Sequence, residues 1–206
     1  MAILRTALLM LLAISSVAAA QFWDTVPFMQ WSDGQVRKVL TGSPWAVTVE
    51  ATLPQRVNAP SGPARQQLYL LWSSALPVRQ AIVRREAGRG ATPTARQDGL
   101  LKQSGAYFIV VDHLPFPFRQ GQVEAFLIRK SKPPITAREF VADKTAQGFA
   151  LQIGFPRTDP IVLEDNEVEF RFKAGSFGAG IPFSRPFEFS RTFKLKNMKV
   201  NGRLEL

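Results

Sequence analysis

The first hydrophobic pattern after the N-terminal segment has the period of an α-helix. Val36, Val39 and Leu40 recur at helical spacing and would form one apolar stripe. Ser32 and Gln35 have the spacing of a capping box, in which the serine hydroxyl accepts the main-chain N–H of the glutamine. A helix of about ten residues is unstable alone in water, so we expect this one to pack against the rest of the domain.

Strict alternation of apolar and polar residues predicts strands in the remainder of the chain. The alternation is clearest at residues 45–53, 166–173 and 187–196, which indicates strands with one buried face. The continuous apolar run at residues 106–111 indicates a strand that is covered on both faces. A second short helix is expected to begin at Pro77, because proline suits the first turn of a helix.

Three further segments carry mixed patterns. Residues 119–130 show a helical apolar stripe, and we expect a short helix that continues into a strand at residues 127–131. Residues 139–155 are expected to form a hairpin that turns at residues 144–148, although a T-x-x-E pattern just before them also fits a helix cap. Residues 87–99 are rich in Gly, Arg and Thr and predict a mobile loop. The chain therefore predicts an α+β fold: an antiparallel sheet or sandwich of about 7–8 strands with two or three short helices.

Residues 1–20 have the composition of an export signal. They contain one arginine, a short apolar run and an A-x-A site that ends at Ala20. The apolar run is shorter than the ~20 residues that a helix needs to span a bilayer. We therefore expect cleavage before Gln21, which would leave residues 21–206 as a single periplasmic or secreted domain without a transmembrane segment.

The composition excludes cysteine chemistry and favours anionic partners. The chain has 206 residues, no cysteine and one histidine, and its 26 basic and 16 acidic residues give a net charge of +10. It can therefore form no disulfide, and it has no thiol nucleophile or cysteine metal ligand. An excess of positive charge attracts anionic polymers and surfaces. The basic residues are scattered along the chain, however, and they also fit a surface whose charge serves solubility alone.

Five arginines are candidates for binding an anionic group. Arg79 follows the proline that begins the second predicted helix, and Arg157 follows a proline at the end of a predicted strand. Arg84, Arg85 and Arg89 cluster at the end of the same helix and in the loop after it. A planar guanidinium suits carboxylate and phosphate groups, but each of these residues could equally pair with a carboxylate of the domain itself.

The sequence predicts no catalytic residue, metal site or cofactor. His113 is the only histidine, and Asp112 is badly placed to orient it, because neighbours on a strand face opposite ways. A group of acidic residues could hold Ca²⁺ or supply a glycosidase pair, but it fits a solvated strand face with cross-strand ion pairs better. Asp159 also fits a turn in which its side chain bonds its own backbone. The acidic residues are Asp159, Glu164, Asp165, Glu167 and Glu169.

Four phrases of the sequence, SPWA, LPVRQA, FPRTDPI and FKLK, resemble in that order a family of exported bacterial proteins without an assigned function. The resemblance covers most of the chain after residue 20. It implies one continuous extracytoplasmic domain, and it implies no reaction and no functional residue.

These observations predict an exported, non-catalytic binding or assembly module. Its partner would be an unknown protein or an anionic envelope polymer. Nucleic acid is disfavoured, because aromatic residues on alternating strands point away from the basic residues. Two alternatives stay open: a carboxylate-based hydrolase that acts on an envelope polymer, and electrostatic association with anionic envelope surfaces.

Overall fold

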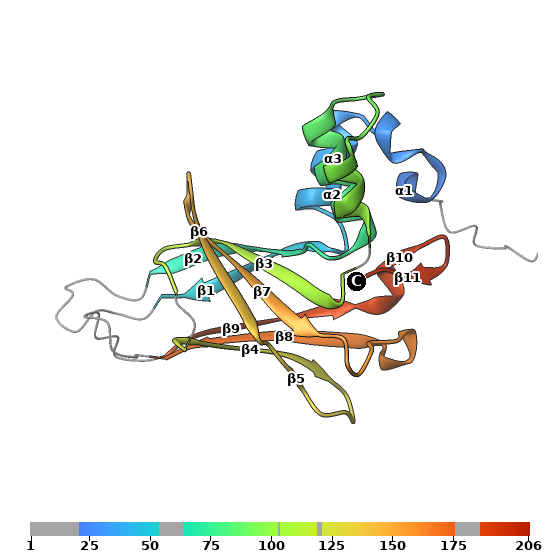
Figure 1. Cartoon of the computed structure of the whole chain (residues 1–206). Coiled ribbons are helices and arrows are strands. Elements are labelled where there is room, and N and C mark those ends of the chain that lie inside the picture. Colours follow the sequence, from blue (N-terminus) through green and yellow to red (C-terminus); the bar gives the residue numbers. More distant parts are fainter. Residues whose placement is uncertain (1–20, 54–63, 103, 119–120, 176–185) are drawn as a thin grey trace, which may run out of the picture.

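The computed structural model describes residues 21–53, 64–102, 104–118, 121–175 and 186–206. Within these residues the chain forms two antiparallel sheets that face each other, with helices gathered at one end of the larger sheet (Figure 1). The α+β prediction is therefore confirmed. The predicted signal peptide lies outside the described residues.

The described residues contain eleven strands, three of which have only two residues each. In spatial order, the five-stranded sheet consists of β1 (Ala46–Thr52), β2 (Arg65–Trp72), β3 (Ala106–Leu114), β7 (Gly148–Pro156) and β6 (Glu139–Thr145). The four-stranded sheet consists of β5 (Ile135–Thr136), β4 (Val123–Arg129), β8 (Glu167–Ala174) and β9 (Phe187–Lys194). A separate hairpin pairs β10 (Lys199–Val200) with β11 (Arg203–Leu204).

Two of the four α-helices in the described part of the chain begin at a side-chain cap. The α-helices are α1 (Phe22–Thr25), α2 (Asp33–Thr41), α3 (Leu76–Ala87) and α4 (Ala95–Leu101), and the 3₁₀ helices are η1 (Phe28–Gln30), η2 (Leu163–Asp165) and η3 (Leu195–Asn197). The predicted capping box of α2 is confirmed: Gln35 N–H donates to Ser32 Oγ at 3.2 Å, and Ser32 N–H donates to Gln35 Oε1 at 2.8 Å. Pro77 lies in the first turn of α3, as expected.

Aromatic side chains that meet edge to face hold the two sheets together. The ring centroids of Trp72 on β2 and Phe193 on β9 lie 5.2 Å apart, and those of Phe155 on β7 and Phe170 on β8 lie 6.2 Å apart. All four side chains are buried, and each such pair adds about 0.5–1.5 kcal/mol beyond the burial of its area. This aromatic core fixes the position of β7 and its neighbour β3, whose ends support the site described below.

Two of the expectations for individual segments are wrong. Residues 123–129 form the strand β4 and not part of a helix, because Val123, Ala125 and Leu127 alternate inward against the other sheet. The expected loop at residues 87–99 includes the start of α4, which Thr94 and Gln97 cap with a second capping box. That T-x-x-Q pattern is visible in the sequence.

The chain forms one hairpin from β6 and β7 in the larger sheet and another from β10 and β11. The hairpin expected at residues 139–155 is confirmed by the pairing of β6 with β7. The β10–β11 hairpin turns at Asn201 and Gly202, whose φ angles are +47° and +77°, as an Asn-Gly type I′ turn requires. None of the helices in the described part of the chain combines the length and the apolar character needed to cross a membrane.

Candidate functional site

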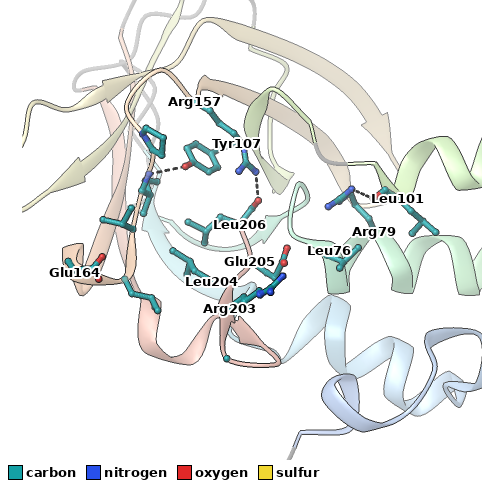
Figure 2. A pocket seen from close by; sticks show the side chains of 15 residues that line it. Leu76, Arg79, Leu101, Tyr107, Arg157, Glu164, Arg203, Leu204, Glu205 and Leu206 are labelled. Atoms are coloured by element: carbon teal, nitrogen blue, oxygen red, sulfur yellow. Dashed lines mark hydrogen bonds between the residues drawn. The ribbon is translucent and has the colours of Figure 1, made fainter.

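Two of the five candidate arginines, Arg79 and Arg157, line the same pocket although they lie far apart in the sequence. Arg79 belongs to α3, and Arg157 directly follows β7. The pocket has a volume of about 680 Å³, and Leu76, Leu101, Tyr107 and residues 160–164 and 202–206 complete its lining. Figure 2 shows both guanidinium groups pointing toward the pocket, with the side chain of Glu205 between them. We call this cavity the arginine pocket.

Arg157 is held by an aromatic ring and by a main-chain oxygen. Its guanidinium carbon lies 4.0 Å from the ring centroid of Tyr107, a cation–π arrangement. Its Nη2 donates a hydrogen bond to the main-chain oxygen of Leu206. Tyr107 is fixed in turn, because it is buried and its hydroxyl accepts a hydrogen bond from the Ile161 N–H at 2.9 Å. The arginine pocket therefore presents Arg157 in a defined orientation.

Arg79 closes the C-terminal end of α4. Its Nη1 donates hydrogen bonds to the main-chain oxygens of Leu101 at 2.6 Å and Lys102 at 2.5 Å, and to that of Leu100 at 3.3 Å. The last turn of a helix leaves carbonyl groups without intrahelical partners, and their partial negative charge attracts a cation. These contacts fix Arg79 without neutralising its charge.

The hydrogen bonding of both guanidinium groups is incomplete in the described part of the chain. Their Nε atoms are buried without a partner there, and no protein acceptor for Arg79 Nη2 or Arg157 Nη1 is found in these residues. No aspartate or glutamate side chain among the described residues forms an ion pair with either group. A partly buried cation with unused N–H groups is stabilised by an anion that accepts from them.

Burial lowers the pKa of both Arg79 and Arg157, because it disfavours the charged form. The negative charge of Glu205 opposes this effect on both pKa values. Three arginines and two glutamates line the pocket, the others being Arg203 and Glu164, so the charged side chains of its lining carry a net charge of +1. Most of the remaining lining residues have apolar side chains.

The segment at Glu205 and Leu206 is anchored to the start of β1. The indole Nε1 of Trp45 donates to the main-chain oxygen of Glu205 at 2.7 Å, and the Glu205 N–H donates to the main-chain oxygen of Met198 at 3.0 Å. Trp45 and Leu206 are both buried. The acceptor that orients Arg157 is therefore itself held by the core.

The structure does not bring Arg84, Arg85 or Arg89 into the arginine pocket. Arg84 is only 3% exposed, and it donates to the main-chain oxygen of Trp31 at 2.9 Å and to Asp33 Oδ1 at 3.1 Å. It joins α3 to the start of α2. Arg85 and Arg89 are exposed, and Arg89 donates to a main-chain oxygen of η1.

The expectation that Asp112 and His113 point apart is wrong. The pairing of β3 with β7 is irregular after Val111, and His113 has a φ of +67°. The local bulge brings Asp112 Oδ2 within 3.7 Å of His113 Nδ1, and Asp112 Oδ1 accepts from the His113 N–H at 2.7 Å. The alternation rule fails here because a bulge turns one residue out of the regular pleat. The pair lies at the opposite end of β3 from Tyr107.

Asp159 pairs with Arg129, and Asp165 pairs with Lys132. The pair with Arg129 replaces the expected contact of Asp159 with its own backbone. Asp159 Oδ2 accepts a hydrogen bond from the buried Arg129 at 2.5 Å, which lowers the pKa of Asp159. Asp165 Oδ1 lies 2.8 Å from Lys132 Nζ. Burial alone would raise the pKa of Asp165, but the hydrogen bonds that it accepts from Lys132 and from the Val162 N–H lower it overall.

The other acidic residues of this group are dispersed. The sequence predicts cross-strand ion pairs for these residues. Glu169 instead pairs at 2.9 Å with Arg171 on the same strand. Glu167 is exposed on β8, whereas Glu164 lines the arginine pocket. In the part of the chain that the structure describes, no group of three or more His, Asp or Glu side chains is placed to hold a metal ion.

Tyr107 and Glu205 belong to the site and were not predicted from the sequence. Tyr107 lies in an apolar run that indicates only a buried strand, and Glu205 lies in a short terminal segment without a distinctive pattern. The Asn-Gly pair at residues 201–202 was the available signal, because it predicts a hairpin that folds the last residues back onto the domain.

Comparisons with protein-family models, with curated proteins and with solved structures gave no match to this chain.

Proposed function

We propose that this protein is an exported binding module whose ligand places a carboxylate or phosphate group in the arginine pocket. The observation that carries the proposal is the convergence of Arg79 and Arg157, two partly buried cations without an aspartate or glutamate ion-pair partner among the described residues. Each has N–H groups that a ligand oxygen can satisfy. We favour binding over turnover, because two fixed cations are sufficient to hold an anion and need no catalytic group beside them.

The support for an anionic group is both electrostatic and geometric. Tyr107 and the end of α4 hold the two guanidinium groups before a ligand arrives, so little side-chain entropy is lost on binding. Both guanidinium groups are partly buried, which makes an ion pair with either of them stronger than one on an open surface. Carboxylate and phosphate share the planar or multidentate oxygen pattern that arginine recognises.

The test is calorimetric titration of the exported protein with inorganic phosphate and, separately, with acetate at low salt. Arg157→Gln should weaken binding by about tenfold, which corresponds to ~1.4 kcal/mol for one lost charged hydrogen bond. Arg85→Gln is the matched control, because it removes the same charge from an exposed position on α3. Equal effects of the two substitutions, or no binding to the unmodified protein, would refute the proposal.

The hydrolase alternative has its own readout. Glu164 and Glu205 both line the arginine pocket, so an enzyme would use them, and Glu205→Gln would abolish turnover of an anionic envelope polysaccharide. We expect no change in polymer length when the polymer is incubated with the protein.

Export itself is checked by the intact mass of the mature protein, which should begin at Gln21.

A further inference from the structure

A second basic pocket lies beside the arginine pocket. It has a volume of about 560 Å³, and three lysines line it: Lys38 near the end of α2, Lys196 in η3 and Lys199 in β10. Asp24 is the acidic residue of its lining, and its Oδ1 accepts a hydrogen bond from the Asn201 N–H at 2.7 Å. We call this cavity the lysine pocket. Its lining carries a net positive charge, and no lysine of the three forms an ion pair with a carboxylate among the described residues.

An unused hydrogen-bond donor also belongs to the lysine pocket. Trp23 lines the pocket and is only 7% exposed, and its indole N–H is buried without an acceptor in the described part of the chain. Most buried polar groups have a partner, so such a donor calls for an explanation. An anionic oxygen in the pocket could accept from the lysine ammonium groups, and from this buried N–H only if the indole shifts toward it.

The two pockets meet at the tip of the β10–β11 hairpin. Gly202 lines both of them. The tip has a defined shape, because Asn201 and Gly202 adopt the positive φ angles of a tight turn, and the bond from Asn201 to Asp24 ties it to the end of α1. Figure 1 shows the hairpin at the edge of the domain, beside the helical end of the larger sheet.

We propose that the arginine and lysine pockets form one continuous track across the β10–β11 hairpin, and that the ligand is a polymer with repeated carboxylate or phosphate groups. This inference rests on the proposed function, since the arginine pocket supplies one of the two attachment points. A single small anion would fill one pocket only. Two adjacent cationic pockets on either side of a fixed turn fit a chain that carries successive negative charges.

The chemistry of the two pockets is complementary. In the arginine pocket, oriented guanidinium groups fix the geometry of one anionic group. In the lysine pocket, ammonium groups act as flexible point charges that tolerate different spacings along a polymer. Because the second contact is intramolecular once the first has formed, the polymer gains affinity without any new contact type.

The experiment compares inorganic phosphate with polyphosphate chains of increasing length, and galacturonate with polygalacturonate, in the same buffer. We expect the long chains of at least one polymer to bind at least about 100-fold more tightly than its monomer, as linked contacts do. The polymer that shows the larger gain identifies phosphate or carboxylate as the natural group. A lysine-pocket triple variant, Lys38→Gln with Lys196→Gln and Lys199→Gln, should lose most of this gain and should bind monomeric phosphate within about twofold of the unmodified protein.

The matched control removes three exposed lysines elsewhere: Lys130→Gln with Lys144→Gln and Lys173→Gln. It lowers the net charge equally and should keep the chain-length gain. Equal losses in the two triple variants would mean that charge alone drives binding, and would overturn the track. Binding of phosphate or galacturonate without a chain-length gain in either polymer would overturn the track and leave the proposed function standing. Absence of both phosphate and galacturonate binding to the unmodified protein would overturn both.

Discussion

Replacement of Trp45 by phenylalanine should weaken both the fold and the arginine pocket. The side chain of Trp45 has no exposed surface, and its ring lies edge to face with that of Trp23 at 5.3 Å. Trp45→Phe keeps an aromatic ring but removes the indole N–H that donates to the main-chain oxygen of Glu205 at 2.7 Å. An unsatisfied buried carbonyl costs about 1–3 kcal/mol. Trp45→Ala also leaves a cavity, so its cost should rise to about 3–5 kcal/mol.

The second effect follows from the position of Glu205. The lost bond frees the segment that contains Leu206, whose main-chain oxygen accepts from Arg157. Arg157 then spends part of its time in other orientations, and phosphate binding should weaken by about 3–10-fold, or ~0.7–1.4 kcal/mol. This loss should be no larger than the loss expected for removal of the arginine itself.

Trp31→Phe is the matched control. Trp31 is equally buried, and its Nε1 donates to the main-chain oxygen of Val26 at 3.0 Å, five residues away. That bond is local and lies outside the arginine pocket. Urea unfolding should show that each substitution lowers the midpoint by roughly 0.5–1 M, whereas calorimetry should show weaker phosphate binding for Trp45→Phe alone. Unchanged binding by Trp45→Phe, despite lower stability, would refute the link between the core and Arg157.

Three further predictions concern stability. Ser32→Ala should lower the free energy of unfolding by about 1 kcal/mol through loss of the α2 cap, and urea unfolding measures it. Asp159 and Asp165 have lowered pKa values in the folded state. The stability they confer is therefore complete above their unfolded pKa of about 4 and is lost as the pH falls through their folded pKa values. The urea midpoints at pH 6 and pH 3 should differ less in a variant with both residues changed to Asn than in the unmodified protein. Gly148→Ala should destabilise the fold by more than about 1 kcal/mol, because φ is +132° and a Cβ would lie 2.4 Å from the Leu114 oxygen; a thermal melt would detect it, and an unchanged midpoint would show that the backbone yields easily.

Local patterns predicted the parts of the fold that depend on local contacts. The cap at Ser32 needs only the residue three positions later, and strand alternation needs only the next residue. The β4 segment was misread because the outward Phe126 completes a helical stripe with Val123 and Leu127, and only the facing sheet decides between the two structures. The relevant information is the identity of the partner layer, which a short window of sequence does not contain.

The candidate site depends on contacts between residues far apart in the sequence, and no short segment of sequence contains both partners. Arg79 and Arg157 were both candidates from their own neighbourhoods, but their convergence depends on how α3 and the end of β7 are placed by the aromatic core. Asp159 was assigned to a turn because its partner, Arg129, lies 30 positions away. The bulge at His113 was missed for a different reason, since a positive φ at a non-glycine residue has no clear signature in one sequence.

The net charge of +10 overstates the charge that is free to attract a ligand. Arg84 and Arg129 are each 3% exposed, and each pairs with an aspartate of the domain, so removal of either partner would leave a buried charge uncompensated. These two arginines serve the fold. Arg79 and Arg157 instead donate to main-chain oxygens and have no aspartate or glutamate ion-pair partner among the described residues. This difference in partner, rather than the number of basic residues, is the reason to expect an anionic ligand at the arginine pocket.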